Sequence, residues 1–185
     1  MRFLAIDFET NGLASDDVHP SGAFPTQVSV HAYDPDKDEI EHLYESYIQG
    51  AESLSSWVME NTHIRLELLQ DAPLPEVVSA RLAALWREND VVVAHNTKFD
   101  LETVLLKIAT KDHPFYKSKR ACTMSQNWCP RLDKPRLYQL CRGLGVPYEI
   151  SESHAASHDS LVVAMCVQAA CHEGMPMKTL QHCGR

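Results

Sequence analysis

The chain has 185 residues, of which 44% are hydrophobic and 23% charged; this ordinary composition excludes disordered and repetitive fibrous proteins. No apolar run approaches the roughly 18 residues of a membrane span, and Asp7 follows the first apolar run too early for a secretory signal. The formal net charge of −8 argues against indiscriminate binding to nucleic acid.

The first third of the chain predicts three strands. Residues 2–9 are short and apolar and end in carboxylates, and residues 10–13 form a turn before a polar loop over 14–26. Strands are expected at 27–33 and 39–48, with a strong turn at 34–38 between them. The second and third strands would form a hairpin added to the first.

The remainder alternates helices and strands. We expect partial helix over 51–70, an amphipathic helix over 75–88, and a buried strand over 91–94. A further helix follows, capped by Asn96 or Thr97, and 110–136 is expected to be irregular and basic. Helices are then expected over 137–144, ended by Gly145, and over 156–172. This order predicts an α/β fold with a mixed sheet in a single domain over 1–185, with its core in about 2–172 and a short tail over 173–185.

The segment 98–142 concentrates positive charge. It holds ten Lys or Arg and four Asp or Glu, a net +6 that leaves −14 for the rest of the chain. This segment is either a track for a phosphate backbone or a solvated loop region. Phe115, Tyr116 and Trp128 lie among these cations and either stack on bases or pack in the core.

All six cysteines lie in the second half of the chain, without a Cys-x2-Cys pair. We interpret them as reduced thiols, which predicts the cytoplasm or another reducing intracellular compartment. The alternative is a zinc site in the tail, formed by Cys171, His172, His182 and Cys183.

Several carboxylates lie where a core would exclude them. Asp7 and Glu9 are two residues apart on a strand, so they share a face with the packing residues before them. Asp100 begins a helix after a buried strand, and Asp159 begins an apolar helix five residues after His154. Each has a simpler interpretation as a solvated or helix-capping group. Together they predict oxygen ligands suited to Mg²⁺ or Mn²⁺.

These residues resemble the motifs of the DEDDh exonucleases, the DnaQ-like group of the RNase H-like superfamily. Asp7-Phe8-Glu9 resembles the first motif and is extended by Thr10-Asn11-Gly12-Leu13; Asn96 to Asp100 resembles the second, and His154 to Asp159 the third. Ala155 occupies the position at which a sister subgroup carries tyrosine, which favours the histidine subgroup. One departure is 61–64, where the family often has a His-Gly-Ile sequence.

The resemblance implies an RNase H-like fold and hydrolysis of phosphodiester bonds from the 3′ end, releasing nucleoside 5′-monophosphates. It implies two divalent cations, Mg²⁺ or Mn²⁺, with Asp7 bridging both, Glu9 and Asp159 holding one and Asp100 the other. His154 would be the general base that deprotonates the attacking water, with His158 as an alternative base.

The partner implied is a nucleic acid 3′ end, single-stranded or frayed. The resemblance assigns the terminal nucleotide to the backbone of Thr10, Asn11 and Gly12 and to the side chain of Leu13, and the scissile phosphate to Asn96 and Lys98. The motifs leave DNA and RNA both open, so an exoribonuclease or oligoribonuclease is an alternative. A non-catalytic nucleic-acid-binding module on the same fold is the rival from another class.

Overall fold

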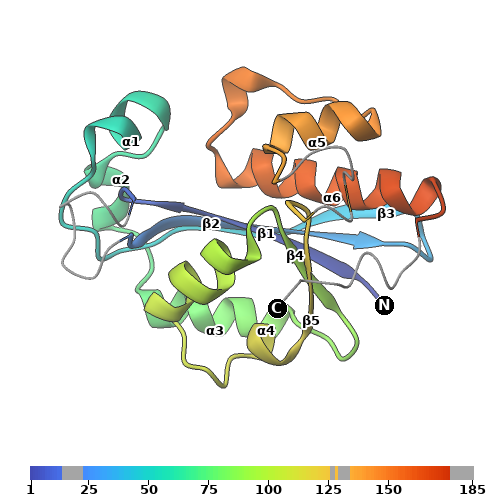
Figure 1. Cartoon of the computed structure of the whole chain (residues 1–185). Helices are drawn as coiled ribbons and strands as arrows, with labels where there is room; N and C mark the ends of the chain where they lie inside the picture. Colours follow the sequence, from blue (N-terminus) through green and yellow to red (C-terminus); the bar gives the residue numbers. More distant parts are fainter. Residues whose placement is uncertain (14–22, 126–127, 129–133, 176–185) are drawn as a thin grey trace.

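The structure is a computed structural model that describes residues 1–13, 23–125, 128 and 134–175. Its centre is a five-stranded sheet in the order β3-β2-β1-β4-β5 (Figure 1). The pairs β1–β2 and β2–β3 are antiparallel, whereas β1–β4 and β4–β5 are parallel. The predicted mixed sheet is confirmed. The strands are β1 (Phe3–Thr10), β2 (Pro25–Asp34), β3 (Glu39–Tyr47), β4 (Val91–Ala94) and β5 (Lys119–Cys122).

Helices cover both faces of this sheet (Figure 1). One face packs against α5 (Leu137–Leu144) and α6 (Ala156–His172), and the other against α3 (Pro75–Leu85), α4 (Pro114–Lys117) and the π-helix η1 (Lys98–Val104). The short helices α1 (Ser56–Asn61) and α2 (Leu66–Gln70) lie at one end of the sheet. The 3₁₀ turns are η2 (Leu105–Lys107) and η3 (Ile150–Glu152). Among the described helices, none is long and apolar enough to cross a bilayer.

The alternation along β1 sorts its side chains between two cores. Phe3 and Ala5 belong to the core under α5 and α6, while Leu4, Ile6 and Phe8 belong to the core under α3 and η1. Because strand residues two apart share a face, Asp7 and Glu9 fall on the side of α6. As predicted, the two carboxylates therefore continue the row of side chains that begins with Phe3 and Ala5.

The expectation of an irregular segment over 110–136 is wrong in part, because it contains α4 and β5. The strand β5 is only four residues long, and of these only Ala121 is fully buried. Lys119 and Arg120 keep its sequence polar, as is common for an edge strand, so it carries no alternating apolar pattern.

The helix expected after Asn96 is not an α-helix. It is η1, a π-helix, and it continues as η2. The Asn96 side chain accepts a hydrogen bond from the Phe99 N–H at 3.4 Å, which is the predicted cap. Single π-helical turns occur frequently at functional sites, and this one carries Asp100.

Two predictions fall in part outside the described residues, namely 14–22 of the loop expected over 14–26 and 176–185 of the tail expected over 173–185. His182 and Cys183 of the zinc alternative belong to that tail. His172 instead donates a hydrogen bond from Nε2 to Asp38 Oδ1 at 2.8 Å, which ties the end of α6 to the β2–β3 turn.

Candidate active site

One cavity of about 480 Å³ collects the five predicted catalytic residues. They come from four distant parts of the chain: β1, η1, the loop before α6, and α6 itself. The described residues around this cavity are Asp7, Phe8, Glu9, Thr10, Gly12, Leu13, Ser55, Trp57, Val58, His95, Asn96, Phe99, Asp100, His154 and Asp159. The structure thus brings together the three motifs that the sequence singled out.

The end of β1 supplies Asp7 and Glu9 because β1 outruns its parallel neighbour. The pairing of β1 with β4 ends at Ala5 opposite Val93, so the later residues of β1 project past β4. The backbone N–H of Phe8 then donates to Asp100 Oδ1 at 3.2 Å. This bond joins the first and second motifs and fixes Asp100 beside the strand.

The start of α6 supplies Asp159, and the loop before it supplies His154. The Asp159 Oδ2 atom accepts a hydrogen bond from the backbone N–H of His154 at 3.2 Å. His154 itself is exposed and has a φ of +64°, a left-handed conformation that non-glycine residues adopt mainly where surrounding structure imposes it. One ligand atom from each of Glu9, His154 and Asp159 lies within 4.8 Å of the other two.

Burial disfavours the charged form of three carboxyl groups of the site, and neighbouring carboxylates add to this effect at Asp7 and Glu9. Burial, followed by the neighbouring charges of Asp100, Asp159 and Glu9, raises the pKa of Asp7 well above its usual range. Burial, and then Asp159 and Asp100, raise the pKa of Glu9 to about 8. Burial raises the pKa of Asp100 to about 8 despite the hydrogen bond from Phe8.

This donor set fits a divalent cation. Four acidic side chains and one imidazole share a partly buried space, and hard oxygen donors are the ligands that Mg²⁺ and Mn²⁺ prefer. A bound cation reverses the electrostatic penalty, because it favours the ionised form of each nearby carboxyl group. Asp7, Glu9, Asp100 and Asp159 are the residues that would hold such ions.

The residues expected to bind substrate divide into two groups. Thr10, Gly12, Leu13 and Asn96 line the cavity, whereas Lys98 and Asn11 are not among its described lining residues. Lys98 is exposed on the first turn of η1.

Asn11 is fully buried and has a structural place instead. Its side chain accepts from the Phe24 N–H at 2.8 Å and donates to the Ser53 carbonyl at 3.3 Å, and its own carbonyl accepts from the Ser55 N–H at 2.9 Å. These bonds hold the turn after β1 against the segment that leads into α1.

The helix α1 and its N-cap contribute a wall of the cavity that the sequence motifs do not indicate. Ser55, Trp57 and Val58 line the cavity, and Ser55 Oγ caps α1 by accepting from the Val58 N–H at 3.3 Å. Trp57 is 47% exposed, and its ring meets the His154 ring edge-on at 4.9 Å between centroids. Trp57, the second residue of α1, directly follows the polar Ser55 and Ser56 and was the available signal in the sequence.

His95 was also overlooked as a wall of the cavity, although it directly precedes the second motif. Its Nδ1 shares a hydrogen bond with Thr123 Oγ1 at 2.9 Å. Burial lowers the pKa of His95 to about 4, so its imidazole is neutral near pH 7. It therefore presents a polar, uncharged group beside the acids.

The base-stacking track considered for the cationic segment is wrong for two of its three aromatic residues. Phe115 and Trp128 are buried in the two cores, at 0% and 2% exposure. Tyr116 is partly buried, donates from its hydroxyl to the Leu101 carbonyl at 2.9 Å, and lies beneath the Arg120 guanidinium. The core interpretation of these aromatic residues is the one the structure supports.

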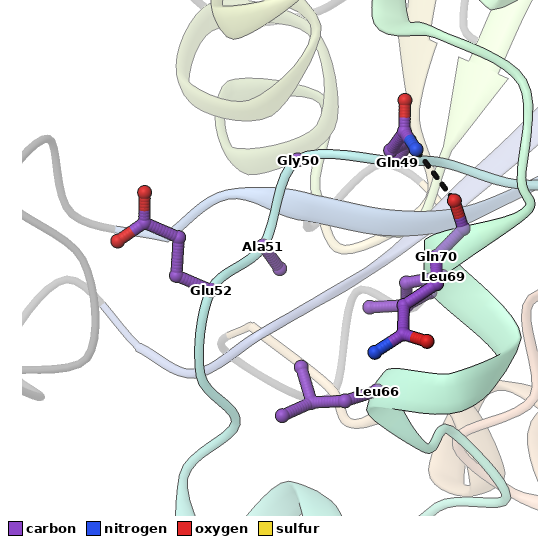
Figure 2. A pocket seen from close by; sticks show the side chains of 7 residues that line it. All are labelled: Gln49, Gly50, Ala51, Glu52, Leu66, Leu69 and Gln70. Carbon is purple, nitrogen blue, oxygen red and sulfur yellow. Dashed lines mark hydrogen bonds between the residues drawn. The ribbon is translucent and has the colours of Figure 1, made fainter.

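Another cavity, of about 530 Å³, lies between the segment after β3 and α2 (Figure 2). Its lining is mostly amide and aliphatic, and Glu52 is the one ionisable residue among the described lining residues. Gln49 Nε2 closes one side by donating to the Gln70 carbonyl (Figure 2). The two cavities are similar in size, so the acidic lining of the first one, and not its volume, identifies the candidate site.

The chain is similar to known proteins in sequence and in fold. The sequence model of the exonuclease family (RNase_T) matches residues 4–166. A DNA polymerase III PolC-type of Bacillus subtilis (strain 168) is 27% identical over 169 residues, which cover 88% of this chain and 11% of that protein, so the chain spans about a tenth of the relative's length.

Among solved structures, a full-length 3′-exonuclease aligns with a TM-score of 0.75 at 18% identity, over 94% of this chain and 61% of its own. A 3′-exonuclease that recognises the 3′ end of a histone mRNA stem-loop aligns with a TM-score of 0.72 at 16% identity, over 94% and 83%. These likenesses confirm the RNase H-like fold. With the three motifs gathered at one cavity and the family match over most of its length, the chain belongs to the exonuclease family, as a DEDDh-type member of the RNase H-like superfamily.

Proposed function

We propose that this protein is a divalent-metal-dependent 3′→5′ exonuclease that hydrolyses single-stranded or frayed nucleic acid to nucleoside 5′-monophosphates. The observation that carries the proposal is the convergence of Asp7, Glu9, Asp100, Asp159 and His154 on one cavity. A non-catalytic binding module has no use for five such residues together, since four crowded carboxylates repel a phosphate backbone unless cations lie between them.

The placement of these side chains supports the following roles. Asp7, Glu9, Asp100 and Asp159 would hold two cations, Mg²⁺ or Mn²⁺, which when bound supply Lewis-acid stabilisation of the phosphodiester displacement. His154 is exposed at the rim beside Glu9 and Asp159, where an imidazole can take a proton from the attacking water. The neutral His95 and the amide of Asn96 contribute polar groups without adding charge.

The nucleic acid would be bound through its terminal nucleotide more than through its phosphate charges. Leu13 is 61% exposed and Trp57 47% exposed, and both line the cavity, so they present apolar surfaces to a terminal base. Base–aromatic stacking tolerates any sequence because every base has a π-face. A mechanism that needs only a strand end fits a chain whose net charge is −8.

The choice between DNA and RNA is part of the proposal's test. The relative from Bacillus subtilis is a DNA polymerase, while one structural neighbour is a 3′-exonuclease that recognises the 3′ end of a histone mRNA stem-loop. Matched 5′-labelled DNA and RNA oligonucleotides, single- and double-stranded, should be incubated with Mg²⁺ or Mn²⁺ and their products resolved. We expect a 3′-shortened ladder, nucleoside 5′-monophosphates and no cleavage in EDTA.

The decisive control is Asp7→Asn, which keeps the size of the side chain but removes its charge. We expect it to reduce the rate by at least about 100-fold, since metal-ion stabilisation contributes several kcal/mol. Folded Asp7→Asn protein that degrades the oligonucleotide as fast as wild type would refute the site assignment.

A further inference from the structure

His158 immediately precedes Asp159 on α6 but takes no part in the cavity that holds the acids. It lines a separate cavity of about 320 Å³, together with His31, His42 and Glu45. The side chain of His158 is 11% exposed and that of Asp159 is 12% exposed, so their contact is largely shielded from water.

The contact is a hydrogen bond of 3.1 Å between His158 Nδ1 and Asp159 Oδ1. A carboxylate can only accept, so Nδ1 carries the proton and donates. The other carboxylate oxygen, Oδ2, accepts from the His154 backbone at 3.2 Å. Asp159 is therefore held at both oxygens, which fixes the plane and tilt of its carboxylate.

This pairing is unusual for neighbours on a helix, because adjacent residues point about 100° apart and do not normally meet. The His158 ring is kept in place by Tyr148, whose ring meets it at an angle of 65° with centroids 5.2 Å apart. The imidazole thus has packing on one side and a hydrogen bond to Asp159 on the other.

We propose that His158 is a positioning residue, which orients Asp159 for metal binding by donating a hydrogen bond from Nδ1 to Oδ1. The inference rests on the proposed function, because it takes Asp159 as a metal ligand. Groups that hydrogen-bond metal ligands from outside fix the ligands' orientation, and their loss typically lowers metal affinity or activity about 10- to 100-fold. His158 acts through Asp159, so it is not a second general base.

Two substitutions separate the hydrogen bond from the packing. His158→Asn places an N–H donor on the carbon that carries Nδ1 but removes the ring, whereas His158→Phe keeps a ring against Tyr148 but removes the donor. Metal-free wild type and both variants should be titrated with Mn²⁺ alone by calorimetry and by the electron paramagnetic resonance signal of free Mn²⁺. Asp159→Asn is the reference for a damaged site, and urea unfolding verifies that each variant is folded.

We expect His158→Phe to weaken Mn²⁺ binding about 10- to 100-fold, and His158→Asn to stay within about threefold of wild type. In activity assays, His158→Phe should require correspondingly more Mn²⁺ for half-maximal rate while retaining most of kcat at saturating Mn²⁺. If His158 contributed only packing, the order of Mn²⁺ affinities would be the opposite, and His158→Asn would bind Mn²⁺ more weakly than His158→Phe.

The outcomes distinguish the two proposals. If His158→Phe binds Mn²⁺ like wild type while Asp159→Asn does not, the positioning role is wrong and the proposed function stands. If the expected order of affinities appears but wild type cleaves no oligonucleotide, the positioning role stands and the proposed function fails. A wild type that binds no Mn²⁺ overturns both.

Discussion

Glu9→Gln should stabilise the metal-free protein, and increasingly so as the pH rises. Burial and the charges of Asp159 and Asp100 raise the pKa of Glu9 from an ordinary 4.5 to about 8. A carboxyl group with a higher pKa in the folded than in the unfolded protein opposes folding as the pH rises between those two values. Glutamine has nearly the same shape but cannot ionise, so it removes that opposition.

The magnitude follows from the shift. One pKa unit corresponds to about 1.4 kcal/mol, so the penalty removed by Glu9→Gln is about 3 kcal/mol near pH 6.5 and grows by about 2 kcal/mol by pH 8.5. Any cost of burying the glutamine amide is the same at both pH values. The quantity to measure is therefore the increase, from pH 6.5 to pH 8.5, in the stability of Glu9→Gln relative to wild type.

The assay is urea unfolding of EDTA-treated protein at both pH values. Glu41→Gln, on the exposed side of β3, is the matched control and should show no such growth. Saturating Mn²⁺ should narrow or reverse the difference in the free energy of unfolding between Glu9→Gln and wild type. The reason is that a ligand at about 100 times its Kd stabilises wild type by about 2.7 kcal/mol. An equal free energy of unfolding for wild type and Glu9→Gln at pH 8.5 would refute the argument for a crowded, buried acidic cluster.

Three further outcomes are expected. His154→Gln should lower kcat about 10²- to 10⁴-fold, the usual contribution of a general base, with binding of an oligonucleotide measured by fluorescence anisotropy little changed. If a base stacks on the exposed ring, Trp57→Ala should weaken oligonucleotide binding by about 1–3 kcal/mol and Trp57→Phe by less. Equal affinities of wild type and Trp57→Ala for the oligonucleotide would exclude stacking. Asp90→Ala should lower the free energy of unfolding by about 3–5 kcal/mol, because it leaves the buried Arg2 guanidinium without its 2.7 Å partner, whereas Asp112→Ala, from an exposed pair, should cost less than about 1 kcal/mol.

The sequence predicts those features of the site that depend on residues close together along the chain. Asp7 and Glu9 had to share a face because strand side chains alternate. Asp159 lies in the first turn of α6, where an acidic residue favours the helix dipole. The helix end at Gly145, which has a φ of +67°, follows from glycine's freedom to adopt the left-handed conformation. These inferences need only the nearest neighbours along the chain.

Other features depend on contacts between distant segments. Nothing local marks β5, since its Lys119 and Arg120 pair with β4 through backbone atoms that every residue has. The same holds for Trp57, which reaches the cavity because Asn11 ties the segment before α1 to the end of β1. Lys98 shows the converse, since it lies within the second motif but is not among the residues that line the cavity.

The sequence by itself determined which residues carry charge and which face of a strand or helix each one occupies. The tertiary structure alone decided that three separate motifs meet, because β1 lies between β2 and β4 and extends past the end of β4 pairing, where η1 and α6 both begin nearby. The tertiary structure also decided that both carboxylate oxygens of Asp159 accept hydrogen bonds. Alternation and helix periodicity are properties of short segments, whereas closeness in space is set by the packing of the whole sheet and its helices.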